Sequence, residues 1–196
     1  GGEGRFSRYV LVMIDGRIVY NSVFSGVNWD ELNLSLDDIE RIEVIRGPNA
    51  ASWGANAVNG IVHIITKKPD AARASRVKAW GGMSDRRGVS VSHTMAVDRD
   101  WALNVSALGQ QWGGMKTLSE DIYEAPHKNW RLDMSLGREL PSSATRLSAD
   151  AFGVDQVTEW GWDDLSSLSS VTQDNQEDKS GWAIQLAHQQ SVFEQG

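Results

Sequence analysis

Hydrophobic and polar residues alternate along most of the second half of the chain. Because the side chains of a strand point alternately to its two faces, such a pattern predicts strands with one apolar and one polar face. Six segments share this period of two: 76–83, 88–97, 101–110, 130–138, 146–151 and 182–189. Strands of about ten residues suit a tilted span across a bilayer, with lipid on the apolar face and a polar lumen on the other.

The connections between these predicted strands differ in length. Residues 98–100 and 140–144 are short turns, whereas 113–128 and 156–179 form long loops in this interpretation. Short turns at one end and long loops at the other are typical of outer-membrane barrels. The connection at 84–87 is an exception, since it is short but would fall on the external side. A soluble β-sandwich with one buried face gives the same alternation and stays open as an alternative.

The first 70 residues mix helical and strand signals and predict a small α+β unit. Asp15-Gly16 lies between two apolar runs, which is a strong signal for a tight hairpin. Ser35, followed three residues later by Asp38, predicts the start of a brief helix. Strands are expected at 9–14, 17–20, 41–45 and 61–66. Alternating apolar residues are expected to pack the core of this unit: Ile42, Val44, Ile61 and Ile64.

Composition narrows the function classes. With 19 Lys and Arg against 26 Asp and Glu, the 196-residue chain carries a net charge of −7, which argues against a partner such as duplex nucleic acid. It has no Cys, which excludes disulfide scaffolds and thiol nucleophiles. No apolar run approaches the roughly 18 residues of a membrane helix. An acidic chain with 9 Trp and 19 Gly is still compatible with membrane β-strands, whose hydropathy signal is weak.

Residue patterns for catalysis are missing from the sequence. The chain has no phosphate-binding loop, no nucleophile elbow and no paired catalytic carboxylates. We therefore predict no enzyme, no metal site and no cofactor. The four His residues lack metal-ligand spacing: His63, His93, His127 and His188.

One long motif resembles a known family. Residues 39–48, IERIEVIRGP, are followed at 52–67 by SWGANAVNGIVHIITK, and 12–16 read VMIDG. These segments closely resemble the plug domain of TonB-dependent outer-membrane receptors, over about residues 8–68. The resemblance implies that 1–70 is the C-terminal part of an α+β plug domain. Residues 71–196 would then be the N-terminal part of an antiparallel transmembrane β-barrel.

The resemblance also implies that the chain is a fragment. The family has a TonB-contacting segment and an earlier plug half before the matching region, and a barrel of about 22 strands after it. This chain supplies about six strands, an incomplete barrel that cannot close, and open sheet edges are not tolerated in lipid.

The family implies energy-coupled uptake of a scarce solute across the outer membrane of a Gram-negative bacterium. A ferric siderophore is the first expectation, with cobalamin or an oligosaccharide as further possibilities. The implied partners are TonB with its inner-membrane energising complex, outer-membrane lipids and a small-molecule ligand such as a ferric chelate. Two alternatives stay open: a soluble Trp-rich β carbohydrate-binding module, and an outer-membrane receptor or adhesin that does not import.

Site residues follow from the same resemblance. The expected ligand-binding positions lie in apical plug loops: Asn28, Trp29, Trp53 and Asn56. For Trp53, a role in packing is an alternative of equal weight to ligand binding. Three plug residues are expected to form ion pairs with the barrel: Arg41, Glu43 and Arg46. The alternative is that they are ordinary solvent-exposed charges of a strand. For Arg41 the two interpretations carry equal weight.

Tryptophans give two further expectations. Residues 155–178, acidic and bearing Trp160 and Trp162, are expected to form an external loop suited to a cationic or sugar-like ligand or to calcium-bridged lipopolysaccharide, or simply a solvated loop. Strand-start tryptophans are expected to form an aromatic girdle at the membrane interface: Trp101, Trp130 and Trp182.

Overall fold

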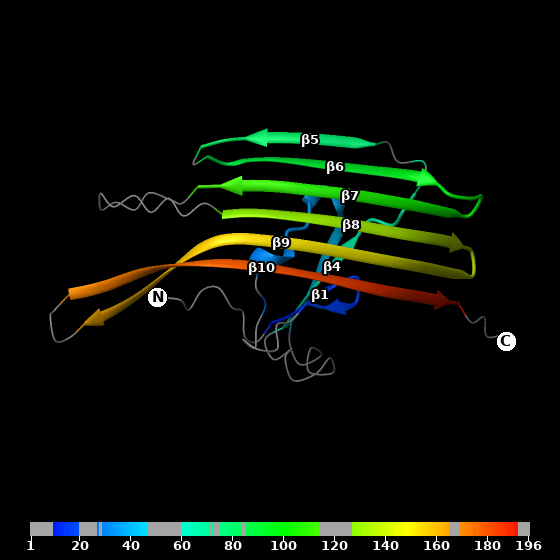
Figure 1. Cartoon of the computed structure of the whole chain (residues 1–196). Helices are drawn as coiled ribbons and strands as arrows, with labels where there is room; N and C mark the ends of the chain where they lie inside the picture. The colour runs from blue at the N-terminus through cyan, green and yellow to red at the C-terminus, as the bar shows by residue number, and fades with distance from the viewer. Residues whose placement is uncertain are drawn as a thin grey trace. The chain divides into compact units, whose positions relative to one another are not determined.

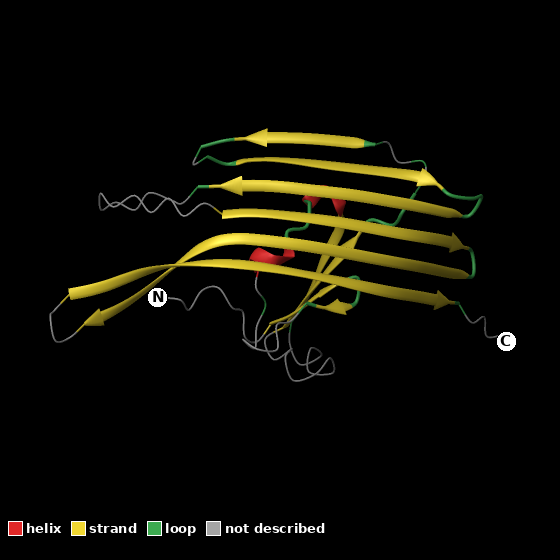
Figure 2. Cartoon of the chain, in the orientation of Figure 1, coloured by secondary structure: helices red, strands yellow, loops and turns green. Residues whose placement is uncertain are grey.

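The structure, a computed structural model, divides the chain into two compact units, Gly1–Lys68 and Pro69–Gly196. It describes residues 10–19, 27, 29–46, 60–70, 72, 75–83, 85–113, 127–164 and 169–191, without the side chains of 30, 157–164 and 169–175. Each unit contains one β-sheet, and most described residues are strand (Figure 2).

The first unit contains a four-stranded sheet, called here the N-terminal sheet, with strand order β2-β1-β4-β3. Its strands are β1 (Val10–Ile14), β2 (Arg17–Ile18), β3 (Ile39–Ile45) and β4 (Gly60–Thr66). β1 is parallel to β4, while β2 and β3 pair antiparallel with their neighbours. Gly60 is required where β4 begins, because its φ is +148° and a Cβ there would lie 2.7 Å from the Ile45 carbonyl oxygen.

The expected hairpin turn is confirmed. Asp15 and Gly16 have φ values of 48° and 82°, so both central residues adopt the left-handed conformation of a type I′ turn. This turn matches the right-handed twist of the flanking strands, and Gly pays no steric cost there.

Helix is scarce in the described part of this unit. It comprises α1 (Trp29–Leu32) and a 3-10 turn at Leu36–Asp38. The helix expected from Ser35 is therefore only this turn, and the Ser35 side chain forms no capping hydrogen bond. The α+β character expected for the unit is not confirmed, since its described residues build mainly a sheet.

The core of the N-terminal sheet lies on both faces of its central strands. On one face Leu11, Met13 and Ile61 are buried, and on the other Val12, Val27 and Ile64 gather further apolar side chains. The expectation for Ile61 and Ile64 is confirmed. It is wrong for the two predicted core residues of β3: Ile42 is 52% exposed and Val44 is 57% exposed. β3 is an edge strand, so the packing that covers β1 and β4 ends before it reaches these side chains.

The second unit contains a six-stranded antiparallel sheet, called here the C-terminal sheet, in the order β10-β9-β8-β7-β6-β5. Each strand pairs with the next along the chain, as Figure 1 shows. The bounds are β5 (Arg76–Gly81), β6 (Arg87–Ala96), β7 (Trp101–Trp112), β8 (His127–Leu140), β9 (Ser143–Asp164) and β10 (Ser169–Gln190). The expected six strands are confirmed; within the described residues they form an open sheet and no closed barrel.

The long loop expected at 156–179 is wrong. β9 and β10 run for 22 residues each and stay paired as far as Asp164 opposite Ser169. The backbone ladder of a hairpin can continue beyond the amphipathic part of its strands, and there the sequence has no regular apolar period to reveal it. Trp160 and Trp162 are consequently strand residues, and Trp182 lies well inside β10 rather than at its start.

Candidate functional site

The register of the C-terminal sheet aligns its apolar side chains into one continuous band. Val105, Met134 and Ala149 are successive cross-strand partners on β7, β8 and β9, and Ile184 extends the row onto β10. These apolar side chains are exposed: Val105 is 42%, Met134 48% and Ile184 66% exposed. The other exposed members on this face are Val77, Val89, Val91, Met95, Trp130, Leu132, Leu147, Trp182 and Leu186. A contiguous exposed apolar patch of this kind marks an interaction surface for lipid or protein.

The band has the height of a membrane strand. On β7 it extends from Trp101 to Gly109, the partner of Trp130. At about 3.4 Å per residue these positions span about 27 Å along the strand, and the usual tilt of membrane strands brings this to about 20 Å. An apolar band of about 25 Å bounded by aromatic residues is the signature of an outer-membrane strand.

The opposite face of the same sheet is polar and largely buried. Its buried polar residues are Ser90, Thr94, Ser106, Asn129, Arg131, Ser135 and Gln156. Hydrogen bonds connect neighbouring strands on this face, for example from the Asn104 amide to the Thr94 hydroxyl at 2.8 Å. Three apolar side chains, of Ala102, Leu108 and Val154, are buried there as well.

Arg131 is the centre of an ion cluster on the polar face. Its side chain is 4% exposed and contacts Asp133 at 2.8 Å and Asp150 at 3.3 Å. Asp133 and Asp150 are direct cross-strand partners. Like charges opposite each other destabilise a sheet, and the guanidinium between them offsets that repulsion. Arg131 is not among the site residues predicted from the sequence, although it lies on the polar face of a strand, near acids of the same face.

Further polar contacts lie at the end of the polar face where β7 ends and β8 begins. The Gln156 amide donates to the Glu177 carboxylate at 3.0 Å, and Lys179 contacts the same carboxylate at 2.8 Å. Trp112 and His127 stack with ring centroids 4.0 Å apart. This end of the sheet therefore presents aromatic, amide and charged groups together.

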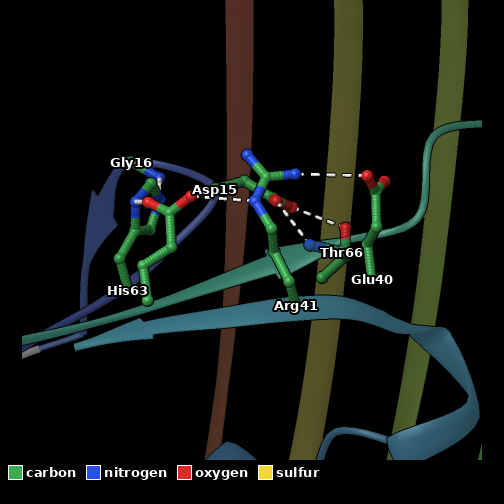
Figure 3. Close-up of polar contacts among 7 residues, drawn as sticks. Asp15, Gly16, Glu40, Arg41, His63 and Thr66 are labelled. Carbon is green, nitrogen blue, oxygen red and sulfur yellow. Dashed lines mark hydrogen bonds and ion pairs between the residues drawn. The ribbon is translucent and has the colours of Figure 1, made fainter.

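In the N-terminal sheet, charged side chains gather on β3 and β4 (Figure 3). The Arg41 guanidinium donates to Glu43 at 2.8 Å and to Glu40 at 3.1 Å. The hydrogen bond that Arg41 donates to the Glu43 carboxylate raises the pKa of Arg41 above its ordinary value. Nδ1 of His63 lies 3.7 Å from the Glu43 carboxylate, so the cluster continues onto β4.

The hairpin turn is tied to β4 through side chains (Figure 3). Asp15 accepts hydrogen bonds from the Thr66 backbone N–H at 2.8 Å and from the Thr66 hydroxyl at 2.7 Å. The Gly16 N–H donates to Nε2 of His63 at 3.0 Å. The turn thus contacts the last residues of β4 through three hydrogen bonds to or from side chains.

The predicted site residues are only partly within the described region. Trp29 opens α1 and is 44% exposed, while Asn28, Trp53 and Asn56 lie outside the described residues. Arg46 directly follows β3 and is exposed. The structure therefore gives no joint geometry for the four expected ligand-binding positions.

Among the residues that the structure describes, no group of three or more His, Asp or Glu side chains is arranged to hold a metal ion.

No helix within the described ranges is long and apolar enough to cross a membrane.

The sequence matches a known family model. Residues 2–61 match the TonB-dependent Receptor Plug Domain. Vitamin B12 transporter BtuB of Vibrio cholerae is 31% identical over 109 residues, which are 56% of this chain and 17% of that protein. The ferric enterobactin receptor of Pseudomonas aeruginosa is 28% identical over 141 residues, 65% of this chain and 18% of the relative. The chain thus spans less than a fifth of the length of these relatives.

Solved structures share the fold. The siderophore receptor PirA from Pseudomonas aeruginosa aligns with a TM-score of 0.55 at 21% identity, over 92% of this chain and 32% of that one. PirA from Acinetobacter baumannii aligns with a TM-score of 0.58 at 20% identity, over 79% and 25% of the two chains. The relatives are receptors and transporters rather than enzymes. The plug match, the curated relatives and the shared fold together identify the chain as a member of the TonB-dependent receptor family.

Proposed function

We propose that this chain acts within an outer-membrane receptor that imports a scarce solute by TonB-dependent coupling. The observation that carries the proposal is the inverted C-terminal sheet, which exposes a band of apolar side chains and buries polar ones. Lipid as the outer solvent explains both faces at once, since apolar side chains then face acyl chains and the polar face lies away from them.

For the substrate, we infer a ferric siderophore first and cobalamin second. The curated relatives carry the names of a vitamin B12 transporter and a ferric enterobactin receptor, and the aligned structures are of siderophore receptors. Asn28, Trp29, Trp53 and Asn56 remain the proposed ligand-binding positions in this function. Trp29 is 44% exposed, which leaves part of its side chain accessible to a ligand and supports that role.

We also keep the proposal that Arg41, Glu43 and Arg46 pair with charges of the surrounding barrel in the assembled receptor. Arg41 and Glu43 bond to each other and are 53% and 44% exposed, so each retains surface for a further charged partner. Arg46 is exposed as well. Such pairs would hold the plug reversibly, because buried ion pairs contribute little net stability.

The test uses the product of the full reading frame that encodes this chain, expressed in a Gram-negative host. Membrane fractionation comes first, and recovery in the outer membrane is expected. A soluble product would contradict the proposal and favour the carbohydrate-binding alternative. Uptake of radiolabelled ferric enterobactin and cobalamin is then compared in hosts with and without TonB. Uptake that persists unchanged without TonB would contradict energy coupling, and binding without any uptake would indicate a receptor that does not import.

A further inference from the structure

The apolar band of the C-terminal sheet ends on β7 at a hollow beside Gly109. A hollow of about 400 Å³ is lined on this face by Gly109 with Arg87, Val89, Gln111 and Lys128, and Trp80, Gly88 and Gln110 complete its lining. A side chain built onto Gly109 would have no heavy atom within 4 Å, so the surface is open directly above this glycine. The hollow therefore lies where a residue of the band is missing.

Two nearby glycines differ from Gly109, because an aromatic ring covers each of them. Trp130, the cross-strand partner of Gly109, leans the other way and covers Gly153 on β9. On the opposite face of β6, Gly88 is likewise covered by an aromatic ring, that of Trp80. Gly109 is the contrasting case, since no atom fills the space of its absent side chain. Its cross-strand partners Val89 and Trp130 thus border a strip one residue long whose floor is bare backbone.

Cations lie at one end of this strip. Arg87 and Lys128 are the cross-strand neighbours of Gln111 on its two sides, in the next row of the same face. Both cations are exposed, and neither forms an ion pair with another described residue. The acids nearby are Asp85, which accepts a hydrogen bond from Gln111 at 3.2 Å, and Asp155, the cross-strand partner of Lys128.

We propose that this hollow binds an anionic lipid, with a phosphate of the headgroup between Arg87 and Lys128 and an acyl chain along the bare strip over Gly109. The inference rests on the proposed function, because the apolar band must face a bilayer. A lipid matches both parts of the site at once: its phosphate complements two cations, and its hydrocarbon fills an apolar groove that begins one row below them. Inorganic phosphate alone would leave the groove empty.

The experiment uses the product of the full reading frame reconstituted in phosphatidylcholine nanodiscs with a minor fraction of phosphatidylglycerol. The lipids that remain bound after transfer to detergent are counted by native mass spectrometry. Enrichment of phosphatidylglycerol over phosphatidylcholine is expected, on the order of fivefold for each cation that contacts the phosphate. The double variant Arg87→Gln with Lys128→Gln should abolish the enrichment, whereas the matched control Arg99→Gln, in the turn at the other end of the strands, should retain it.

A second variant tests the groove. In Gly109→Leu the added Cβ has no heavy atom within 4 Å, so the variant is expected to fold, but its side chain fills the strip and should lower the retention of both lipids. Enrichment that survives the double variant would overturn the inference, as would an equal loss in Arg99→Gln. Displacement of the lipid by millimolar inorganic phosphate would also overturn it, because the site would then recognise the ion. A protein that inserts but shows no enrichment contradicts this inference only, whereas a protein that fails to insert contradicts the proposed function.

Discussion

The two sheets of this chain bury opposite kinds of side chain. In the N-terminal sheet, Val12 and Ile61 are fully buried, and charged residues such as Arg41 and Glu43 stay at the surface. In the C-terminal sheet, Ile184 is 66% exposed while the Arg131 side chain is 4% exposed. The first pattern suits a sheet surrounded by water, and the second suits a sheet that faces lipid.

The C-terminal sheet shows that a period of two assigns residues to faces without saying which face is buried. Burial follows from the medium on each side of the sheet, which the alternation by itself leaves open. Substitutions placed on the two sheets can therefore break or sharpen the contrast. All of them are made in the product of the full reading frame.

The largest effect is expected from Arg131→Met. It would leave Asp133 and Asp150 facing each other without the cation between them, and removing one partner of a buried ion cluster costs about 3–5 kcal/mol in the free energy of unfolding. Denaturant-induced unfolding in detergent micelles measures the loss. Arg99→Met in an exposed turn is the control, and adding Asp133→Asn and Asp150→Asn should restore much of the stability. A loss equal to that of the control would mean that the polar face is not energetically buried.

Ile61→Ala is expected to destabilise the N-terminal sheet by about 2–5 kcal/mol, because the removed atoms leave a cavity in a core without solvent contact. Hydrogen exchange of the β1 and β4 amides measures the local free energy of opening. Ile184→Ala is the matched change in the C-terminal sheet, where the side chain is exposed and truncation leaves no cavity. Similar losses at the two positions would remove the contrast between the sheets.

Ile184→Arg tests the medium at the apolar band directly. A cation near the middle of a lipid-facing strand costs about 2–4 kcal/mol in a bilayer. Gln185→Arg places the same side chain on the next residue, which points to the polar face, and should cost much less. Folding into lipid vesicles, followed by the change in gel mobility between unfolded and folded barrels, compares the two variants. Equal folding would indicate that water rather than lipid surrounds the band.

A smaller effect is expected from Thr66→Val. This variant keeps the backbone hydrogen bond to Asp15 but deletes the 2.7 Å hydroxyl bond, and losing one hydrogen bond to a carboxylate costs about 1–2 kcal/mol. Faster hydrogen exchange at Asp15 and Gly16 is the expected observation. Thr66→Ser retains the hydroxyl and should exchange nearly as slowly as the unchanged protein. Unchanged exchange in Thr66→Val would show that the turn is held by its backbone geometry instead.

The smallest effect is expected from Arg41→Gln. Its ion pairs with Glu40 and Glu43 are exposed, and such pairs are weakened by solvent and salt. The thermal unfolding midpoint of the N-terminal sheet should stay within experimental error at 0.15 M salt, a concentration at which the screening length is about 8 Å. A large decrease would mean that Arg41 is buried in the assembled receptor, which would contradict the weakly stabilising, reversible pairing proposed for it.

Strand positions were predictable where one face differs from the other. The segments 88–97 and 101–110 correspond closely to β6 and β7, because their apolar residues occupy every second position. The outer halves of β9 and β10 were not predictable, since their many acidic and amide residues resemble a loop. Neither was the exposure of Ile42 and Val44, which depends on β3 lying at the edge of its sheet.

Site chemistry was less predictable than the strands. The sequence marked Arg41 and Glu43 as charged residues of one strand, but their direct hydrogen bond depends on side-chain geometry. The Arg131 cluster and the hollow at Gly109 depend on cross-strand register, which joins residues 17 or more positions apart. Register is set by pairing along the whole strand, so it cannot be read from one segment.

The sequence by itself determined the family resemblance, the Asp15-Gly16 hairpin and the assignment of side chains to the two faces of the amphipathic strands. These features depend on local backbone preference and on a period of two, which are written in neighbouring residues. Tertiary structure decided which face is buried, how far β9 and β10 extend and which charges meet. Those outcomes depend on the order and register of strands that are distant in sequence, and on the packing that the resulting sheets provide.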